Sequence, residues 1–293
     1  MDKFSTIFLI AALFIIMLGM GLSLTVQDFK RVIVYPKAVL TGLINQIVLL
    51  PFIGFLLIWL FPVRPEIAVG IMILAACPGG ATSNLITHLS KGDTALSVTL
   101  TALSSIVTIF TIPFIVQFAL LYFLEQEQKV VLNIPQVIGQ LFVITIIPIS
   151  IGMLIKSKNP AFATKMDKPV KRASAVVLAI VILGIIIKEK SNVISYFEQA
   201  GVLALMLNLA SLFVGYITAK TIMRLRTRQA ISISVESGIQ NGTLAIAIAT
   251  ITIGHNELAI AGAIYSLIML FTGIGIVAFS GYLKPEEEAV PAG

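Results

Sequence analysis

The chain has 293 residues, a formal net charge of +6 and a mean hydropathy of +1.02, with 58% hydrophobic and 12% charged residues. Soluble domains carry about 25% charged residues, so this composition excludes a soluble protein and predicts an integral membrane protein. The net positive charge does not predict nucleic-acid binding, because the lysines and arginines lie in loops between apolar runs rather than along one face. A single cysteine, Cys77, excludes an intrachain disulfide and a cysteine-based structural zinc site.

Nine apolar runs follow one another along the chain. Each approaches or exceeds the ~20 residues that a helix needs to cross ~30 Å of hydrocarbon, and helices are required because backbone groups in lipid must be satisfied internally. The runs cover approximately residues 4–24, 36–60, 67–88, 94–121, 133–155, 171–188, 196–221, 229–253 and 257–281. We therefore predict an all-α membrane fold of about nine transmembrane helices, forming a single transporter domain over residues 1–293. The first run is interpreted as a span rather than a cleaved signal peptide, because Lys3 is its sole preceding cation.

The loop charges predict the orientation in the membrane. Most of the 20 lysines and arginines fall in alternate loops, for example Lys30, Lys91, Lys156 and Arg226. Positive loops stay on the cytoplasmic side, so we expect the N-terminus outside and the C-terminus inside a multi-pass cell-membrane protein. Asp93, at the start of the fourth run, is predicted to cap that helix.

The third run is interrupted near its middle. Residues 78–80 read Pro-Gly-Gly and residues 82–84 read Thr-Ser-Asn. Proline removes a backbone donor and glycine permits unusual backbone angles, so the helix is predicted to break at this point.

The eighth run shows a second interruption. It carries Glu236, Gln240 and Asn241, with Gly238 and Gly242 interleaved. A broken helix presents free carbonyls, which suit a cation, and free amides, which suit an anion. Two such interrupted segments in corresponding parts of two halves are typical of a transporter site. The alternative is that the glycines allow close helix packing and the polar groups hold neighbouring helices together.

Glu236 differs from the other acidic residues of the chain. All the others lie in or beside a predicted loop or terminus. A carboxylate at the centre of a membrane helix costs roughly 2.5–3.5 kcal/mol, and no lysine or arginine lies at a similar depth in any run. The predicted partner of Glu236 is therefore a metal cation or a proton.

Neutral oxygens occur in two further runs. Gln46 lies in the second, and Ser97 and Thr101 lie four residues apart, on one face, in the fourth. A single hydroxyl of this kind more often bonds to the preceding helical turn. Together with Gln46 and Glu236, these groups would supply oxygens around a hard cation.

These motifs resemble the bile acid:sodium symporter family over essentially the whole chain. The matching stretches are Cys77-Pro-Gly-Gly-Ala-Thr-Ser-Asn, Gly92-Asp-Thr-Ala-Leu-Ser-Val-Thr-Leu-Thr, Glu236-Ser-Gly-Ile-Gln-Asn, Met20-Gly-Leu-Ser-Leu, and Gln46 followed by Leu50-Pro51. The resemblance implies a core domain, in which two broken helices cross, beside a smaller panel domain. The core would comprise about residues 36–121 and 196–281, and the panel about residues 4–24 and 133–188. It also implies the nine-helix arrangement, with an inverted repeat that lacks its first helix.

The same resemblance implies two sodium sites and a substrate site, with no catalytic residues and no cofactor besides the two coupling ions. The first sodium site would use Ser83, Asn84, Ser97, Thr101 and Glu236. The second would use Gln46, Glu236 and Gln240, with backbone carbonyls near Ser237 and Ile239. The substrate site would include Ala81, Thr82, Asn241 and Met269.

Two departures from the family pattern fall on the substrate side. Ala81-Thr82 transposes the Thr-Ala pair that is common in the family, and Met269 and Leu270 stand where some bacterial relatives have a polar pair. The anion is therefore left open among bile acids, hydroxy acids, keto acids and sulfonates, and so is the oligomeric state.

The sequence thus predicts a sodium-coupled symporter that imports a small organic anion by alternating access. The alternative is a proton-coupled organic anion transporter in which Glu236 titrates. A channel and a membrane enzyme are less favoured, the latter because Cys77 has no evident base and His88 and His255 lie near the ends of runs.

Overall fold

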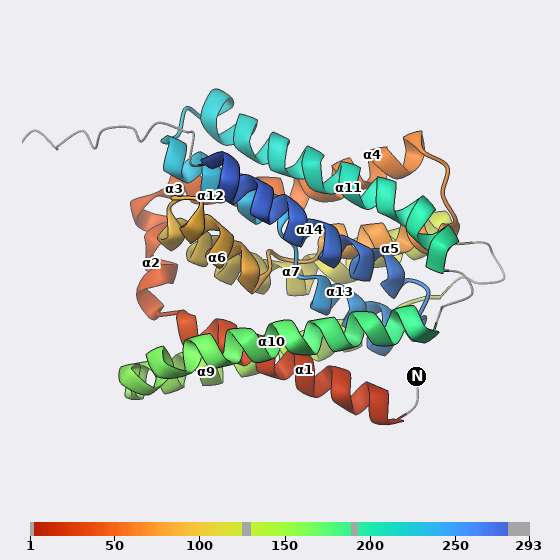
Figure 1. Cartoon of the computed structure of the whole chain (residues 1–293), viewed down its shortest axis with the longest axis horizontal. Coiled ribbons are helices and arrows are strands. Elements are labelled where there is room, and N and C mark those ends of the chain that lie inside the picture. The colour runs from red at the N-terminus through yellow and green to blue at the C-terminus, as the bar shows by residue number, and fades with distance from the viewer. Residues whose placement is uncertain (1–2, 125–129, 189–192, 281–293) are drawn as a thin grey trace, which may run out of the picture.

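The computed structural model describes residues 3–124, 130–188 and 193–280, and this part of the chain is almost entirely helical, with no β-strand (Figure 1). The helices are α1 (Lys3–Ser23), α2 (Val26–Val34), α3 (Pro36–Ile44), η1 (Asn45–Leu49), α4 (Leu50–Leu60), α5 (Pro65–Ala76), α6 (Ala81–Leu89), α7 (Thr94–Phe123), α8 (Ile134–Leu141), η3 (Phe142–Ile146), α9 (Ile147–Lys158), α10 (Pro160–Lys188), α11 (Val193–Ile217), η4 (Thr218–Ile222), α12 (Thr227–Gly238), α13 (Gly242–Ala247), η5 (Ile248–Ile253) and α14 (Ala259–Ser280). The segments η1, η3, η4 and η5 are π-helical turns, which widen a helix locally.

All nine predicted runs lie on helices. Among the described residues, five continuous helices are long and apolar enough to cross a membrane alone, and the pair α1 and α2 qualifies as a sixth, bent span. The five are Pro36–Leu60, Thr94–Phe123, Ile134–Lys158, Phe197–Ile222 and Ala259–Ser280. The remaining runs fall on α10 and on two helices that are broken in the middle, so the all-α membrane fold is confirmed.

Two details differ from the prediction. The chain bends by 62° after α1 into the short helix α2, which was not expected because its sequence, Val-Gln-Asp-Phe-Lys-Arg-Val-Ile-Val, contains no long apolar run. Helix α10 begins at Pro160 rather than near residue 171, because its charged first turns continue the helix without being apolar.

The same order of elements occurs twice. A helix with a π-turn (Pro36–Leu60) precedes the broken helix α5–α6 and the straight helix α7, and a second π-turn helix (Phe197–Ile222) precedes the broken helix α12–α13 and the straight helix α14. Figure 1 shows that the two sets run in opposite directions: α3 and α4 run from left to right, whereas α11 runs from right to left. The two breaks therefore approach one another from opposite ends of the molecule.

Helices α1, α9 and α10 pack against one another and form a group along one side, below the broken helices in the view of Figure 1. Gly21 and Gly152 allow α1 and α9 to approach closely, because a Cβ at either would meet the backbone of the other helix. These helices fall within the residues assigned to the panel from the sequence, which also include α8 and η3, and the division into core and panel stays a prediction.

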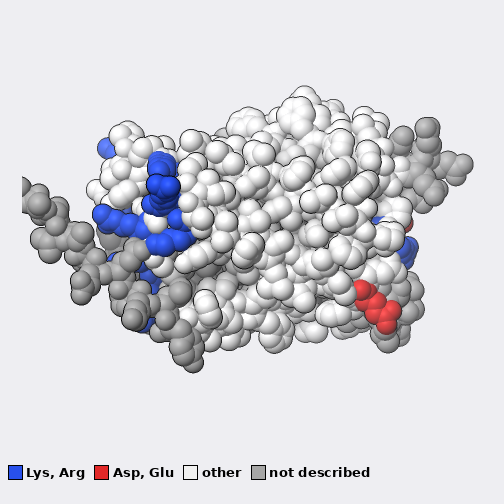
Figure 2. All heavy atoms as spheres, turned by 90° about the horizontal axis from the view of Figure 1, so that it is seen from above, with Lys and Arg blue, Asp and Glu red and all other residues white. Residues whose placement is uncertain are grey.

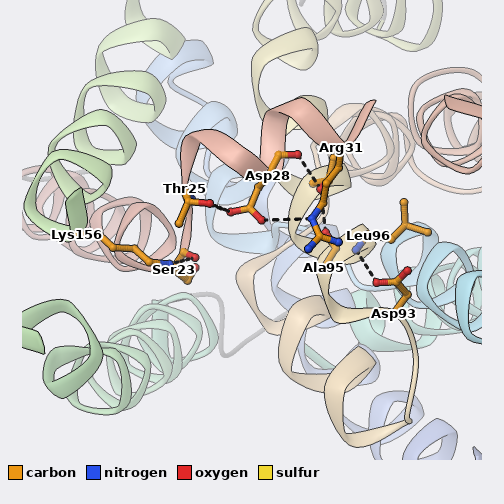
Figure 3. A network of polar contacts seen from close by, with 9 residues as sticks. Ser23, Thr25, Asp28, Arg31, Asp93, Ala95, Leu96 and Lys156 are labelled. Atoms are coloured by element: carbon orange, nitrogen blue, oxygen red, sulfur yellow. Dashed lines mark hydrogen bonds and ion pairs between the residues drawn. The ribbon is translucent and has the colours of Figure 1, made fainter. Parts of the chain in front are cut away.

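Basic side chains gather at one end of the face shown in Figure 2. A polar network at this end connects α2 and α7 (Figure 3). The Asp28 carboxylate accepts bonds of 2.7 Å from the backbone amide and from the hydroxyl of Thr25, and the Asp28 carbonyl accepts from Thr99 at 2.9 Å. Asp93 caps α7 as predicted, accepting from the Leu96 amide at 3.0 Å.

Candidate functional site

The two broken helices meet where their helical hydrogen bonding stops. Helix α5 ends at Ala76 and α6 begins at Ala81, and α12 ends at Gly238 and α13 begins at Gly242. The two breaks pair as one antiparallel bridge: the Gly80 amide donates to the Ile239 carbonyl at 2.9 Å, and the Asn241 amide donates to the Pro78 carbonyl at 3.0 Å. The predicted crossing of two interrupted helices is thus present. The C-terminal ends of α5 and α12 and the N-terminal ends of α6 and α13 adjoin it.

The Glu236 carboxylate lies beside this crossover and is 2% exposed. Its Oε1 atom accepts from Thr101 Oγ1 at 2.6 Å, and its Oε2 atom accepts from Ser83 Oγ at 2.7 Å and Ser97 Oγ at 3.1 Å. Gly79 makes this approach possible, because a Cβ at that position would overlap the carboxylate. A buried acid is therefore held by three hydroxyls from α6 and α7.

The side chains predicted for the first sodium site form one network. Asn84 completes it: its Oδ1 atom lies 2.9 Å from Ser97 Oγ and 3.4 Å from Thr101 Oγ1, and it shares the single hydrogen of each hydroxyl with the Glu236 carboxylate. Each hydroxyl has two lone pairs besides its hydrogen, so the group offers one carboxylate and several neutral oxygens to a cation. In the described part of the chain, no three His, Cys, Asp or Glu side chains gather as a metal site. This donor set suits a hard monovalent cation better than a transition metal.

The side chains predicted for the second sodium site form a separate group of contacts beside the bridge. Gln46 Nε2 donates to Gln240 Oε1 at 2.7 Å and to the Cys77 carbonyl at 2.7 Å, and Gln240 Nε2 donates to the Ser237 carbonyl at 2.8 Å. The Ile239 carbonyl accepts from Gly80 in the bridge. Gln46, Ser237 and Gln240 are thus brought together, and each carbonyl oxygen retains a second lone pair.

Glu236 joins the second group through its backbone rather than its carboxylate. Its carbonyl accepts from Gln240 Nε2 at 3.4 Å, whereas the hydrogen bonds of its carboxylate, within the described residues, all go to the hydroxyls of the first group. The structure places Glu236 between the two groups, with its charge directed towards the first.

The residues predicted to meet the substrate divide into two kinds. Ala81 and Thr82 are partly exposed at the start of α6, whereas Asn241 is 5% exposed and Met269 is 2% exposed. Asn241 Oδ1 caps α13 by accepting from the Leu244 amide at 3.0 Å, while its buried Nδ2 atom has no hydrogen-bond partner in the described structure. Met269 lies in the packed core, apart from any exposed surface of this conformation.

A clamp that the sequence analysis missed fixes the end of α12. Asn208 Nδ2 from α11 and the Tyr265 hydroxyl from α14 each donate to the Gly238 carbonyl at 2.8 Å, and both side chains are fully buried. Asn208 is the asparagine within the apolar run 196–221. An amide side chain at that depth in the membrane indicates a buried hydrogen-bond partner, and this was the feature of the sequence that could have revealed the clamp. The clamp fixes the Gly238 carbonyl, two residues before Gln240.

The chain is similar in sequence to known sodium-dependent transport proteins. Residues 10–196 match the model of the Sodium Bile acid symporter family. A rice protein named "Probable sodium/metabolite cotransporter BASS1, chloroplastic" is 27% identical over 86% of this chain, which spans 60% of that relative's length. The Bacillus subtilis "Uncharacterized sodium-dependent transporter YocS" is 29% identical over 80% of the chain and 71% of its own length. The human "Ileal sodium/bile acid cotransporter" is 27% identical over 92% of the chain and 78% of its own length.

The matched residues contain Gln46, Ser83, Asn84, Ser97 and Thr101, while Glu236 and the second break lie beyond them in the sequence. Both parts meet at one crossover in the structure. The chain belongs to the sodium bile acid symporter family, whose members are sodium-dependent transporters.

Proposed function

We propose that this protein is a sodium symporter that carries a small organic anion into the cell, with two sodium ions bound beside the crossover. The observation that carries the proposal is the Glu236 network: one buried carboxylate held by three hydroxyls and adjoined by an amide oxygen. Among the described residues Glu236 has no lysine or arginine as an ion-pair partner. A buried charge requires compensation, and bound sodium would provide it.

The charge balance favours an anion as the second cargo. Two sodium ions bring two positive charges and Glu236 offsets one, so a single carboxylate or sulfonate would neutralise the rest. The unpartnered Asn241 Nδ2 donor and the half-helix starts at Ala81 and Gly242 support binding of an anion at the crossover. The names of the rice and human relatives specify a metabolite and a bile acid, which together fit an organic anion of either kind.

The mechanism follows from the position of the two groups. Sodium would draw the oxygens of α6, α7 and α12 together, order the crossover and prepare its amides for the anion. The group α1, α9 and α10 would then move against the crossover helices to change the side of access. We place the N-terminus outside and the basic end in the cytoplasm, as the loop charges indicate.

The test is thermal unfolding of the purified protein in detergent against sodium, with potassium at equal ionic strength. A ligand that binds the folded state alone raises its stability by about 2.7 kcal/mol at a hundredfold excess over Kd. We expect sodium-specific stabilisation in the wild type and its loss in Glu236→Gln. Glu198→Gln, which makes the same charge change at an exposed position, is the matched control.

The alternative outcomes separate the candidate mechanisms. A wild type that responds to pH but not to sodium would favour proton coupling through Glu236. Sodium stabilisation that persists in Glu236→Gln would overturn the role of this carboxylate.

A further inference from the structure

A column of buried hydroxyl groups leads from Glu236 to the basic end of the molecule. Helix α6 contributes Ser83 and Thr87, four residues apart on one face, and its C-cap residue Ser90 follows three residues later. Helix α7 contributes Ser97 and α12 contributes Ser232. All five side chains are fully buried, at 0% exposure.

Hydrogen bonds connect the first part of this column step by step. Ser97 Oγ donates to Glu236 Oε2 at 3.1 Å, and Thr87 Oγ1 donates to Ser97 Oγ at 3.3 Å. Beyond Thr87 the next contact is with Gly92, whose backbone amide donates to the Thr87 carbonyl at 2.9 Å. The column therefore runs from the carboxylate through Ser97 and Thr87 to the turn between α6 and α7.

The turn of residues 90–93 closes the column at the surface. Ser232 Oγ lies 2.9 Å from both the Asp93 and the Arg228 carbonyls and shares its hydrogen between them, and the Asp93 amide donates to the Arg228 carbonyl at 3.0 Å, so the turn is tied to α12 at two points. Gly92 fits tightly under the turn, because a Cβ there would lie 2.8 Å from Thr87 Cγ2 and 3.0 Å from Ser232 Oγ. Lys91, with φ of 57°, adopts a left-handed conformation that side chains rarely take.

Two observations distinguish this column from hydroxyls that serve only helix packing. Buried hydroxyls in helices normally bond to the preceding turn, whereas Thr87 Oγ1 donates across to Ser97 of α7. Ser90 Oγ is buried and has no hydrogen-bond partner among the described residues. The negative end of the α6 dipole also points to this turn, which favours a cation despite the basic side chains around it.

We propose that this column is the route by which sodium leaves the first site towards the basic end, and that the turn of residues 90–93 is its gate. The inference rests on the proposed function, since it assumes that sodium binds at Glu236. Thr87 supplies an oxygen between the site and the gate, and Ser232 holds the gate shut. The two residues therefore have opposite effects on the rate of release.

The test measures binding and release of radioactive sodium by the purified full-length protein in detergent, without any organic substrate. Equilibrium binding gives Kd, and dilution into unlabelled sodium gives the dissociation rate. We expect Thr87→Val to slow dissociation about three- to tenfold and Ser232→Ala to accelerate it by a similar factor, with Kd within about threefold of the wild type. Thr145→Val, a buried threonine of η3 outside the column, is the control and should match the wild type.

The outcomes are distinguishable. Unchanged dissociation rates in both column variants, with sodium still bound, would overturn the route. Loss of equilibrium binding in Thr87→Val would make this hydroxyl part of the sodium site instead, which also overturns the route. Failure of the wild type to bind sodium would overturn the proposed function itself.

Discussion

Thr101 makes the shortest hydrogen bond to the Glu236 carboxylate, at 2.6 Å. If sodium binds here, Thr101→Val removes one oxygen ligand while retaining the shape of the side chain. Hydrogen bonds to charged groups contribute about 1.5–3 kcal/mol, so we expect the sodium concentration for half-maximal stabilisation to rise by roughly tenfold or more. Thermal unfolding across a sodium series measures it.

The matched control for that change is Thr108→Val. Thr108 lies on the same helix and is equally buried, but its hydroxyl makes only a 3.5 Å contact with the Ser105 carbonyl. An equal loss of sodium response in both variants would show that any hydroxyl of α7 matters, and not the network around Glu236.

The Tyr265 hydroxyl acts on the site through the backbone. Tyr265→Phe deletes its 2.8 Å bond to the Gly238 carbonyl and leaves the ring in place. We expect the free energy of unfolding to fall by about 1 kcal/mol, and the sodium midpoint to shift as well, because the end of α12 loses one of its two clamping donors. Thermal unfolding with and without sodium separates these effects.

Tyr216→Phe serves as the comparison, because the Tyr216 hydroxyl does not bond to the Gly238 carbonyl. A Tyr265→Phe protein that is less stable but has an unchanged sodium midpoint would reduce the clamp to a purely structural role.

The break in the α5–α6 helix depends on the small size of Gly79. A Cβ at this position would overlap the Glu236 carboxylate, so in Gly79→Ala either the carboxylate or the bridge to Gln240 must move. We expect the sodium-dependent stabilisation to be abolished while the protein still inserts in the membrane. Gly139→Ala on α8 is the control, because nothing lies within 4 Å of its added methyl group. A normal sodium response in Gly79→Ala would mean that the crossover tolerates rearrangement.

The positions of the breaks could be predicted because their causes are local. Pro78 and the adjoining glycines interrupt a helix whatever surrounds them, and Glu236 draws attention because an acid is costly at that depth. Helix α2 was missed because a nine-residue amphipathic helix has no long apolar run, and its attachment through Thr99 depends on a residue far along the chain.

The clamp of Asn208 and Tyr265 is a part of the site that could not be predicted from the sequence. These residues come from α11 and α14 and meet a carbonyl of α12. A single polar residue in an apolar run indicates that some partner exists, but it does not indicate which one. Such pairings depend on how separate helices pack, which spacing within each helix does not encode.

The distribution of charge predicts how the whole molecule lies in the membrane. Lys158, at the end of α9, belongs to the basic end, whereas His255, before α14, lies at the opposite end, and both side chains are exposed. Cysteines placed at these two positions should therefore face opposite sides. Cys77 is fully buried, so the wild-type protein supplies a background of low reactivity.

In intact cells, a membrane-impermeant maleimide should label His255→Cys at once, whereas Lys158→Cys should react only after the membrane is permeabilised. The physical reason is that lysine and arginine in short loops are retained on the cytoplasmic side. The reverse pattern would invert the orientation and, with it, the proposed release of sodium to the cytoplasm through the turn of residues 90–93. Labelling of both positions in intact cells would mean that the chain does not separate its two ends across the bilayer.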